Sequence, residues 1–342
     1  MQVLTLGEIL LRLSPPGHER FVQADRFEAE YGGSEANVAV ALAQWGVESA
    51  FATKLPDNAL GEAALGHLRR YGVDTAPIAW GGNRLGKYFL EKGAAQRGSS
   101  VFYDRAGSAA STLTPEKLPL EDRLQEAEWL HWSGITPALG EGPRRTVEAA
   151  CEAAQDAGVK VSCDLNYRGK LWGEAEAQRM MRPLMEQVDV CIGGRGDPFS
   201  VLGLEDSQDG PPTVEVDEDA YSEVARRMKE RFGFEAVALT LRESHSASMN
   251  AFSALLLDEA DCQTCLRSAR YEMDLVDRVG GGDAFSAGLI YGLLEKDNTR
   301  EALEFAVAAS CLKHTIPGDV NLASLDEVEA LAAGGTGGQV SR

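Results

Sequence analysis

The sequence predicts an α/β protein with a mostly parallel central sheet, helices on both of its faces and a small additional antiparallel sheet. From about residue 114 onward, helix-like segments alternate with short apolar runs, which is the pattern of a parallel sheet covered by helices. Earlier in the chain, segments 86–91 and 99–105 alternate aromatic and charged residues without a long helix between them. That arrangement is typical of antiparallel strands outside a parallel core.

The first part of the chain is expected to contribute two central strands, two helices and a lid. Residues 2–6 predict the first strand, and they lack the basic start of a signal sequence. Small and apolar residues over 34–46 predict a buried helix. A strand over 49–54 and a helix over 58–71 follow. The lid strands are expected within about 9–31 and 84–106.

The later alternation predicts four helix–strand units and three closing helices. These helices are expected over 115–126, 142–157, 174–187 and 218–232, and their strands over 128–132, 159–163, 188–192 and 236–240. A strand pair is expected over 246–257, and the closing helices over 284–295, 299–314 and 324–332. The acidic segment 203–220 predicts an exposed loop. Residues 1–333 are expected to form a single domain, with 334–342 as a flexible tail.

Composition excludes several classes of function. Of the 342 residues 44% are hydrophobic, enough for a sizeable core, but no apolar run is long enough for a membrane span. A net charge of −20 argues against nucleic acid or an anionic membrane as a partner. Any site for an anionic substrate must therefore be locally basic.

Cysteine usage favours the reducing cytoplasm. Most of the six cysteines lie in apolar runs and are expected to be small core residues. The pair Cys262 and Cys265 is a single C-x-x-C, and zinc would need two further ligands at suitable spacing, which the sequence does not offer.

The stretch from Asp277 to Phe285 places three glycines and an aspartate at the start of a predicted helix. Backbone N–H groups at a helix start lack partners and carry partial positive charge, and glycine lets an anion approach them closely. Asp283 would then stand beside an anion site. This pairing suits phosphoryl transfer, in which amides hold the developing charge and a carboxylate accepts the proton of the attacking hydroxyl. The alternative is a glycine-rich turn with Asp283 as an ordinary helix cap.

A second glycine stretch, Gly32 to Asn37, opens the buried helix near Ser34. Its two glycines allow a ligand to lie against the backbone, and Asn37 offers both a donor and an acceptor one turn into the helix. The alternative is a turn whose polar residue satisfies the helix end.

Polar residues also follow several of the predicted parallel strands. Asn166 and Arg168 follow the strand at 159–163, and Thr240 and Arg242 lie at the end of the strand at 236–240. Ligands of such sheets bind beyond the carboxyl ends of the strands, so these residues are expected near one site. Neither a dinucleotide G-x-G-x-x-G after the first strand nor a P-loop is present.

Together these segments resemble the ribokinase-like carbohydrate kinases, the PfkB family. Gly32–Asn37 matches the first signature of that family, and Asp277–Phe285 matches the second, with Gly281 where many members have alanine. The resemblance extends from Val3 to about Leu331. It implies a three-layer α/β/α kinase domain with a small antiparallel β lid.

Within the family, four further stretches look like the 2-dehydro-3-deoxygluconate (KDG) kinases. They are Tyr88–Glu91, Tyr103–Ala109, Asp164–Arg168 and Lys313–Asp319. The resemblance implies ATP-dependent phosphorylation of KDG to 2-dehydro-3-deoxy-6-phosphogluconate. KDG carries a carboxylate, and Arg105 and Arg168 are expected to provide the forked donors that a carboxylate needs. For each arginine the alternative is a surface salt bridge.

The resemblance also implies the role of each site residue. Asp283 is the expected base, and the amides of Gly280, Gly281 and Gly282 are expected to hold the transferred phosphoryl group. The sugar acid is expected to contact Gly33, Ser34, Asn37, Tyr88, Tyr103, Arg105, Arg168 and Asp319. The nucleotide is expected at Asn166, Arg168, Thr240, Arg242, Gly280 and Gly282.

ATP and Mg²⁺ are the implied cofactors, and the metal is expected to be held mainly by phosphates and water. The family usually has an Asn-x-x-Glu pattern after the strand at 188–192, but this chain has Gly194 and Asp197 at those positions. No direct metal ligand is therefore expected, and Asp197 would act through water.

Three functional alternatives stay open at this point. The chain is a KDG kinase, a kinase for a related acid or neutral sugar (2-dehydro-3-deoxygalactonate, fructose or ribose), or a sugar-acid sensor with weak turnover. The resemblance further implies a homodimer, or a higher homo-oligomer, that pairs through the lid.

Overall fold

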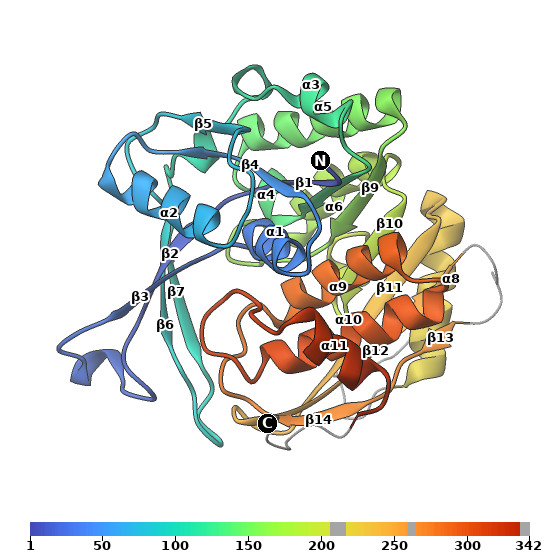
Figure 1. The fold of residues 1–342 in the computed structure, drawn as a ribbon. Helices are drawn as coiled ribbons and strands as arrows, with labels where there is room; N and C mark the ends of the chain where they lie inside the picture. The colour runs from blue at the N-terminus through green and yellow to red at the C-terminus, as the bar shows by residue number, and fades with distance from the viewer. Residues whose placement is uncertain (206–216, 259–264, 336–342) are drawn as a thin grey trace.

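The computed structural model describes residues 1–205, 217–258 and 265–335, and it builds them around one ten-stranded sheet (Figure 1). The strand order is β13-β12-β11-β10-β9-β8-β1-β4-β5, and β14 pairs with β12. Neighbours from β5 to β11 run parallel, whereas β12 runs antiparallel to β11, β13 and β14. The prediction of a mostly parallel sheet is confirmed. The strands are β1 (Val3–Leu6), β4 (Ser49–Leu55), β5 (Ile78–Trp80), β8 (Trp129–Ser133), β9 (Lys160–Asp164), β10 (Val190–Gly194), β11 (Ala236–Ser244), β12 (Met249–Leu257), β13 (Leu266–Arg267) and β14 (Tyr271–Asp274).

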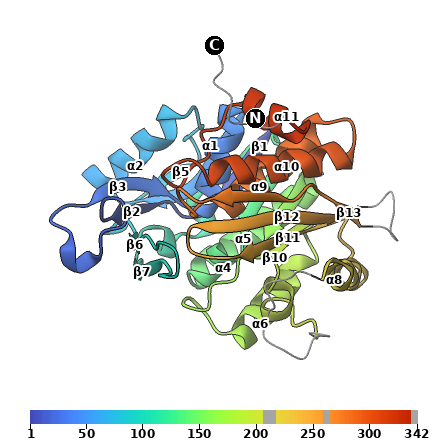
Figure 2. The same ribbon diagram turned by 90° about the horizontal axis from the view of Figure 1, so that it is seen from below.

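Helices cover both faces of this sheet, so the three-layer prediction is also confirmed (Figure 2). One face packs against α5 (Glu141–Ala157), α6 (Glu174–Met185) and α8 (Glu218–Phe232), whose apolar sides share a core with the strands. The other face packs against α1 (Ser34–Gln44), α9 (Gly281–Glu295), α10 (Thr299–Lys313) and α11 (Leu325–Ala332). Helix α2 (Ala59–Arg70) joins α1 and β4 in a third cluster.

A separate four-stranded sheet forms the lid, in the order β3-β2-β6-β7. Its strands are β2 (Leu10–Ser14), β3 (Glu28–Gly32), β6 (Lys87–Glu91) and β7 (Ser100–Asp104). The pairs β2–β3 and β6–β7 are antiparallel, and a parallel pairing of β2 with β6 joins them. Because side chains alternate along a strand, each lid strand has one side toward the main body and one side away from it.

Two predicted elements are wrong in detail. The helix expected over 115–126 is a 3₁₀ turn (Pro115–Lys117) and a short α3 (Leu120–Leu124), because Pro119 stands between them and has no N–H to give to a continuous helix. The strand pair expected over 246–257 is one strand, β12, since β11 continues to Ser244 and the turn lies at 245–248.

Some predictions fall partly outside the described residues. Most of the acidic loop at 203–220, Cys262 and most of the tail at 334–342 lie there, although 218–220 are already the first turn of α8. The other five cysteines are buried, and four of them, Cys151, Cys163, Cys191 and Cys311, are free thiols. Within the described ranges no helix is both long enough and apolar enough to cross a membrane.

Helix α9 is fixed in place by an unusually close contact with α10. A side-chain carbon at Gly288 would stand 2.7 Å from the Cα of Ala306, and Gly292 faces Ala302 in the same way one turn later. The seam is therefore made of residues without room for a larger side chain. Since helices resist shear when their backbones touch, the seam fixes the position of the first turn of α9.

We expect Gly288→Ala to destabilise the protein by about 1–3 kcal/mol, because the added carbon must force α9 and α10 apart. Gly66→Ala is the matched control, since Gly66 lies on exposed α2 with open space around it. Alanine there should stabilise by about 0.5–1 kcal/mol through its better helix propensity. Denaturant unfolding of both variants provides the measurement, and equal effects would contradict the close seam.

Candidate active site

A cleft of about 620 Å³ lies between the lid, the carboxyl ends of the parallel strands and the start of α9. The lid contributes Tyr88, Leu90 and Tyr103, and the main body contributes the ends of β9, β10 and β11. This is where the topology of a parallel sheet places ligands. All of the residues predicted for the site line this cleft except Gly281, which lies just behind it.

The three glycines turn the chain into α9 as the sequence predicted. Gly280 precedes the helix with φ of 82°, and a side-chain carbon there would overlap the carbonyl oxygen of Asp319. Only glycine satisfies both conditions. Gly282 has open space around it and lines the cleft. The N–H groups of this first turn have no partner within the helix, so they carry the partial positive charge of the helix start.

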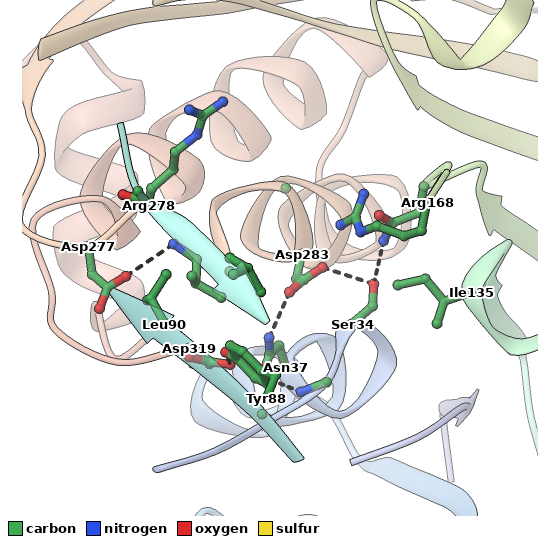
Figure 3. A pocket seen from close by; sticks show the side chains of 18 of the residues that line it. Ser34, Asn37, Tyr88, Leu90, Ile135, Arg168, Asp277, Arg278, Asp283 and Asp319 are labelled. Atoms are coloured by element: carbon green, nitrogen blue, oxygen red, sulfur yellow. Dashed lines mark hydrogen bonds between the residues drawn. The ribbon is translucent and has the colours of Figure 1, made fainter. Parts of the chain in front are cut away.

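Asp283 lies in the first turn of α9, not at its cap, so the capping alternative is wrong. Its carboxylate accepts hydrogen bonds from the Ser34 hydroxyl at 2.9 Å and from the Asn37 amide nitrogen at 2.6 Å (Figure 3). Burial at the cleft floor raises the pKa of Asp283 above its ordinary value, and these two donors oppose the rise. The two glycine stretches, almost 250 residues apart in the chain, thus meet at one carboxylate.

Ser34 also connects Asp283 to the end of β9. Its hydroxyl accepts a hydrogen bond of 3.0 Å from the side-chain nitrogen of Asn166. Asn166 has φ of 40°, an uncommon conformation that turns the chain sharply after β9 and brings Arg168 to the cleft. In Figure 3, Arg168 stands close to Ser34 and Asp283.

A buried ionic network that the sequence did not reveal ties the lid to the main body. Arg12 of β2 is 1% exposed, and its guanidinium contacts Asp277 and Asp319 at 2.6 Å each. Tyr88 donates its hydroxyl proton to the same Asp319. The only sequence signal for Arg12 was a charged residue within the apolar run Leu10–Leu13. Asp319, predicted as a sugar contact, is therefore also a partner of the lid.

Arg105 differs from the expectation of a free cation for the substrate. Its guanidinium binds the carboxylate of Glu8, which also accepts from the Ser108 hydroxyl. Arg105 lines the cleft beside Tyr103, but its charge is already balanced. By contrast, no carboxylate of the described chain lies within 4.0 Å of Arg168.

The other end of the cleft is basic despite the overall charge of −20. Arg168, Arg195, Arg242 and Arg278 all line it. Burial lowers the pKa of Arg242 to about 9, with Arg278 and Arg168 lowering it further, and burial also lowers the pKa of Arg278. Such a group of cations is the locally basic site that an anionic substrate requires.

The altered 193–197 stretch forms a closed turn. Asp197 accepts hydrogen bonds from the amide of Gly194 at 2.7 Å and from the amide of Tyr167 at 3.2 Å. It therefore fixes the end of β10 against the segment after β9. Burial, followed by the charges of Asp197 and Asp283, raises the pKa of nearby Asp164. In the described ranges no three His, Cys, Asp or Glu residues could together hold a metal ion.

Glu35, within the first signature, supports the site from below. It is buried, and one carboxylate oxygen accepts from the Ser133 amide and hydroxyl and from the Thr136 hydroxyl, at 2.6–3.0 Å. Its side chain fills the space that a side chain at position 7 would need, which explains Gly7 at the end of β1. Burial raises the pKa of Glu35 to about 7.

Comparison with known proteins agrees with this geometry. Residues 2–324 match the model of the pfkB family carbohydrate kinases. The chain belongs to this family. Among solved structures it is similar to a 2-dehydro-3-deoxygluconokinase from Thermotoga maritima, with 49% identity, a TM-score of 0.92 and coverage of 97% of this chain and 98% of that one.

Two curated relatives are similar over nearly their whole lengths. A 2-dehydro-3-deoxygalactonokinase from Haloferax volcanii is 34% identical and covers 98% of both chains. A 2-dehydro-3-deoxygluconokinase from Bacillus subtilis is 27% identical and covers 94% of this chain and 92% of its own. The family predicted from the two glycine signatures is thus confirmed.

We expect Glu35→Gln to flatten the pH dependence of stability below pH 7. Between the ordinary value of 4.5 and about 7 the folded protein holds a proton that the unfolded chain has lost. Unfolding then releases a proton, so the free energy of unfolding falls as pH rises through this window, by up to about 1.4 kcal/mol per pH unit. Glutamine keeps the accepting oxygen but cannot titrate. Thermal unfolding from pH 5 to 7.5 measures the slope, with exposed Glu62→Gln as the control, and an unchanged slope would refute this role.

Proposed function

We propose that this protein transfers the terminal phosphoryl group of ATP to the 6-hydroxyl of 2-dehydro-3-deoxygluconate. The observation that carries the proposal is the Asp283 carboxylate, held by Ser34 and Asn37 beside the amides that open α9. This geometry fits a hydroxyl nucleophile on one side and a phosphoryl group on the other. The similarity to the Thermotoga maritima kinase supports the choice of sugar acid.

Asp283 would accept the hydroxyl proton as the hydroxyl oxygen attacks phosphorus. The two donors fix the carboxylate in one orientation, so its oxygen toward the substrate is positioned before the substrate arrives. Its raised pKa makes it a better base than a fully solvated aspartate. The amides of Gly280, Gly281 and Gly282 would hold the charge that develops on the transferred group. Because the base must be ionised, activity should fall as pH drops through the raised pKa.

The sugar acid would lie between the lid and α1, against Gly33, Ser34, Asn37, Tyr88, Tyr103 and Asp319. Its carboxylate would pair with Arg168, which has no carboxylate of the described residues within 4.0 Å. Arg105 would help through its position beside Tyr103, although Glu8 already balances its charge.

The nucleotide would occupy the basic end, near Asn166, Thr240 and Arg242. Mg²⁺ fits there on the chemistry of the donors. Asp164 and Asp197 both line the cleft, and burial raises the pKa of each carboxyl, with the charge of Asp197 raising the pKa of Asp164 further; a nearby cation would favour their ionised forms. These two carboxylates would hold the ion through water, and the ion would neutralise phosphate charge. We place the reaction in the cytoplasm, which the free thiols of Cys151, Cys163, Cys191 and Cys311 support.

The first test is coupled ADP release with Mg-ATP on the purified protein. We expect turnover with KDG and, because Asp283→Asn keeps the shape but removes the base, a loss of at least about 100-fold in kcat for that variant. 2-Dehydro-3-deoxygalactonate belongs in the panel, given the Haloferax volcanii relative, together with fructose and ribose. Ligand-induced thermal stabilisation without ADP release would instead indicate a sensor.

Arg168→Met separates acidic from neutral substrates in the same assay. Loss of the guanidinium should raise KM for a sugar acid by roughly 10- to 100-fold, because a charge-assisted pair to a carboxylate is lost. A neutral sugar should lose little. Arg145→Met on exposed α5 is the matched control. An unchanged KM for KDG would remove Arg168 from substrate binding.

We also propose that the protein pairs with a second copy through the outer side of the lid. Phe21, Phe27, Phe89 and Phe102 form a chain of ring contacts there, with centroids 6.1–6.5 Å apart. Phe102 is 64% exposed, an uncommon state for so large an apolar side chain. Tyr88 and Leu90 alternate with Phe89 and point to the cleft instead.

Light scattering should give about twice the chain mass of 36.7 kDa for the unaltered protein. Phe102→Asp places a charge within the proposed interface and should shift the mass to one chain. Leu60→Asp, at an exposed position in the first turn of α2 that is not part of this chain of aromatic rings, should leave it unchanged. A single-chain mass for the unaltered protein would rule out the lid dimer.

A further inference from the structure

Arg242 has a partly buried guanidinium that no anion of the described residues balances. It lines the basic end of the cleft, its Nε atom is buried without a hydrogen-bond partner, and within the described ranges no carboxylate lies in salt-bridge distance. Its flat face rests on Phe252, with 5.7 Å between the guanidinium carbon and the ring centre. Arg168 and Arg278 are close enough to disfavour its charge. A cation that is partly removed from water is stabilised by a counter-charge, so this arrangement suits a bound anion.

His314 holds Arg242 from behind. The His314 ring is buried, and its Nδ1 lies 2.6 Å from the carbonyl oxygen of Ser310. A carbonyl oxygen only accepts, so Nδ1 carries the proton and Nε2 presents a lone pair. That lone pair faces Nη2 of Arg242 at 3.4 Å. Burial and Arg242 lower the pKa of His314 to about 3, which keeps the ring neutral and the lone pair available.

Gly281 supplies the space that His314 occupies. Many family members have alanine at position 281. In this chain a side-chain carbon there would overlap the imidazole of His314. Ser310 also donates its hydroxyl proton to the carbonyl oxygen of Gly281 at 2.7 Å, so α10 supports the first turn of α9 from below. Gly281, His314 and Arg242 are therefore connected. A larger residue at position 281 would displace the His314 ring, and displacement of that ring would remove its contact with Arg242.

We propose that Arg242 binds the phosphate groups of the nucleotide and that His314 is the positioning residue that aims it, in the space left by Gly281. The inference rests on the proposed phosphotransferase function for its ligand. It goes beyond that function in two respects. It assigns Arg242 an ionic contact with the phosphates during phosphoryl transfer, and it explains the glycine at position 281 by the space that His314 needs. A guanidinium at the transferring phosphates would balance charge that grows in the transition state.

Nucleotide binding without sugar tests the contact directly. Calorimetry measures the affinities of the protein for a non-hydrolysable ATP analogue, ADP and AMP. Arg242→Met should weaken binding of the triphosphate most and leave the affinity for AMP unchanged within about twofold. Arg242→Lys should restore part of the loss, since it keeps the charge but not the fork. In turnover, kcat/KM for ATP should fall by about 100-fold with Arg242→Met, while KM for the sugar stays nearly constant. Arg145→Met again serves as the exposed control.

A double-variant comparison tests the positioning role. Gly281→Ala should lower kcat/KM for ATP at least tenfold in the unaltered background, because the ring must move. In the His314→Asn background, which has no ring to displace, the same alanine should cost less than about twofold.

The proposal fails if Arg242→Met binds the triphosphate like the unaltered protein, or if Gly281→Ala costs the same in both backgrounds. Thermal unfolding of each variant separates these outcomes from a loss of folding. The calorimetric experiment contains no sugar. Absence of KDG turnover would therefore refute the proposed substrate, but it would not test the contact between Arg242 and the nucleotide phosphates.

Discussion

The guanidinium of Arg12 is the interaction on which the arrangement of the site depends. It joins three separate parts of the chain, namely the lid strand β2, Asp277 at the start of the glycine turn and Asp319 after α10. Charges this deeply buried are tolerated only when paired, and removal of one partner typically costs about 3–5 kcal/mol. The network therefore fixes the position of the lid relative to the glycine turn. The cleft exists because both of its walls are attached to one residue.

The sequence allowed the layers and most of the site to be predicted because periodic patterns are local. The alternation after residue 114 and the two glycine signatures each lie within a few residues, and they led to the sheet and to Asp283. The pairing of Arg105 with Glu8 could not be read in this way, since the two residues are 97 positions apart. The same holds for Arg12, whose partners lie 265 and 307 positions away. A charged residue in an apolar strand signals a partner but does not identify it.

The departures from the family pattern were visible in the sequence, but their meaning required the structure. Gly194 appeared as a lost asparagine, whereas its amide is a donor that fixes Asp197. Gly281 stood out only as a glycine where many family members have alanine, and the structure shows that it accommodates His314. In both cases the glycine is matched to a specific neighbour. Substitutions of this kind are best understood in pairs, because the space left by one residue is filled by another.

The close seam between α9 and α10 has a consequence for how such a kinase can diversify. Gly288 and Gly292 leave the helix no freedom to shift, so the first turn and Asp283 are held as a fixed reference point. The lid, by contrast, lines the cleft with Leu90 of β6 and Tyr103 of β7, and neither side chain belongs to the Arg12 network that fixes the lid to the glycine turn. Chemistry and selectivity are thus encoded in separate stretches of the chain. A lineage can therefore alter selectivity at lid positions outside the Arg12 network while the start of α9 stays unchanged.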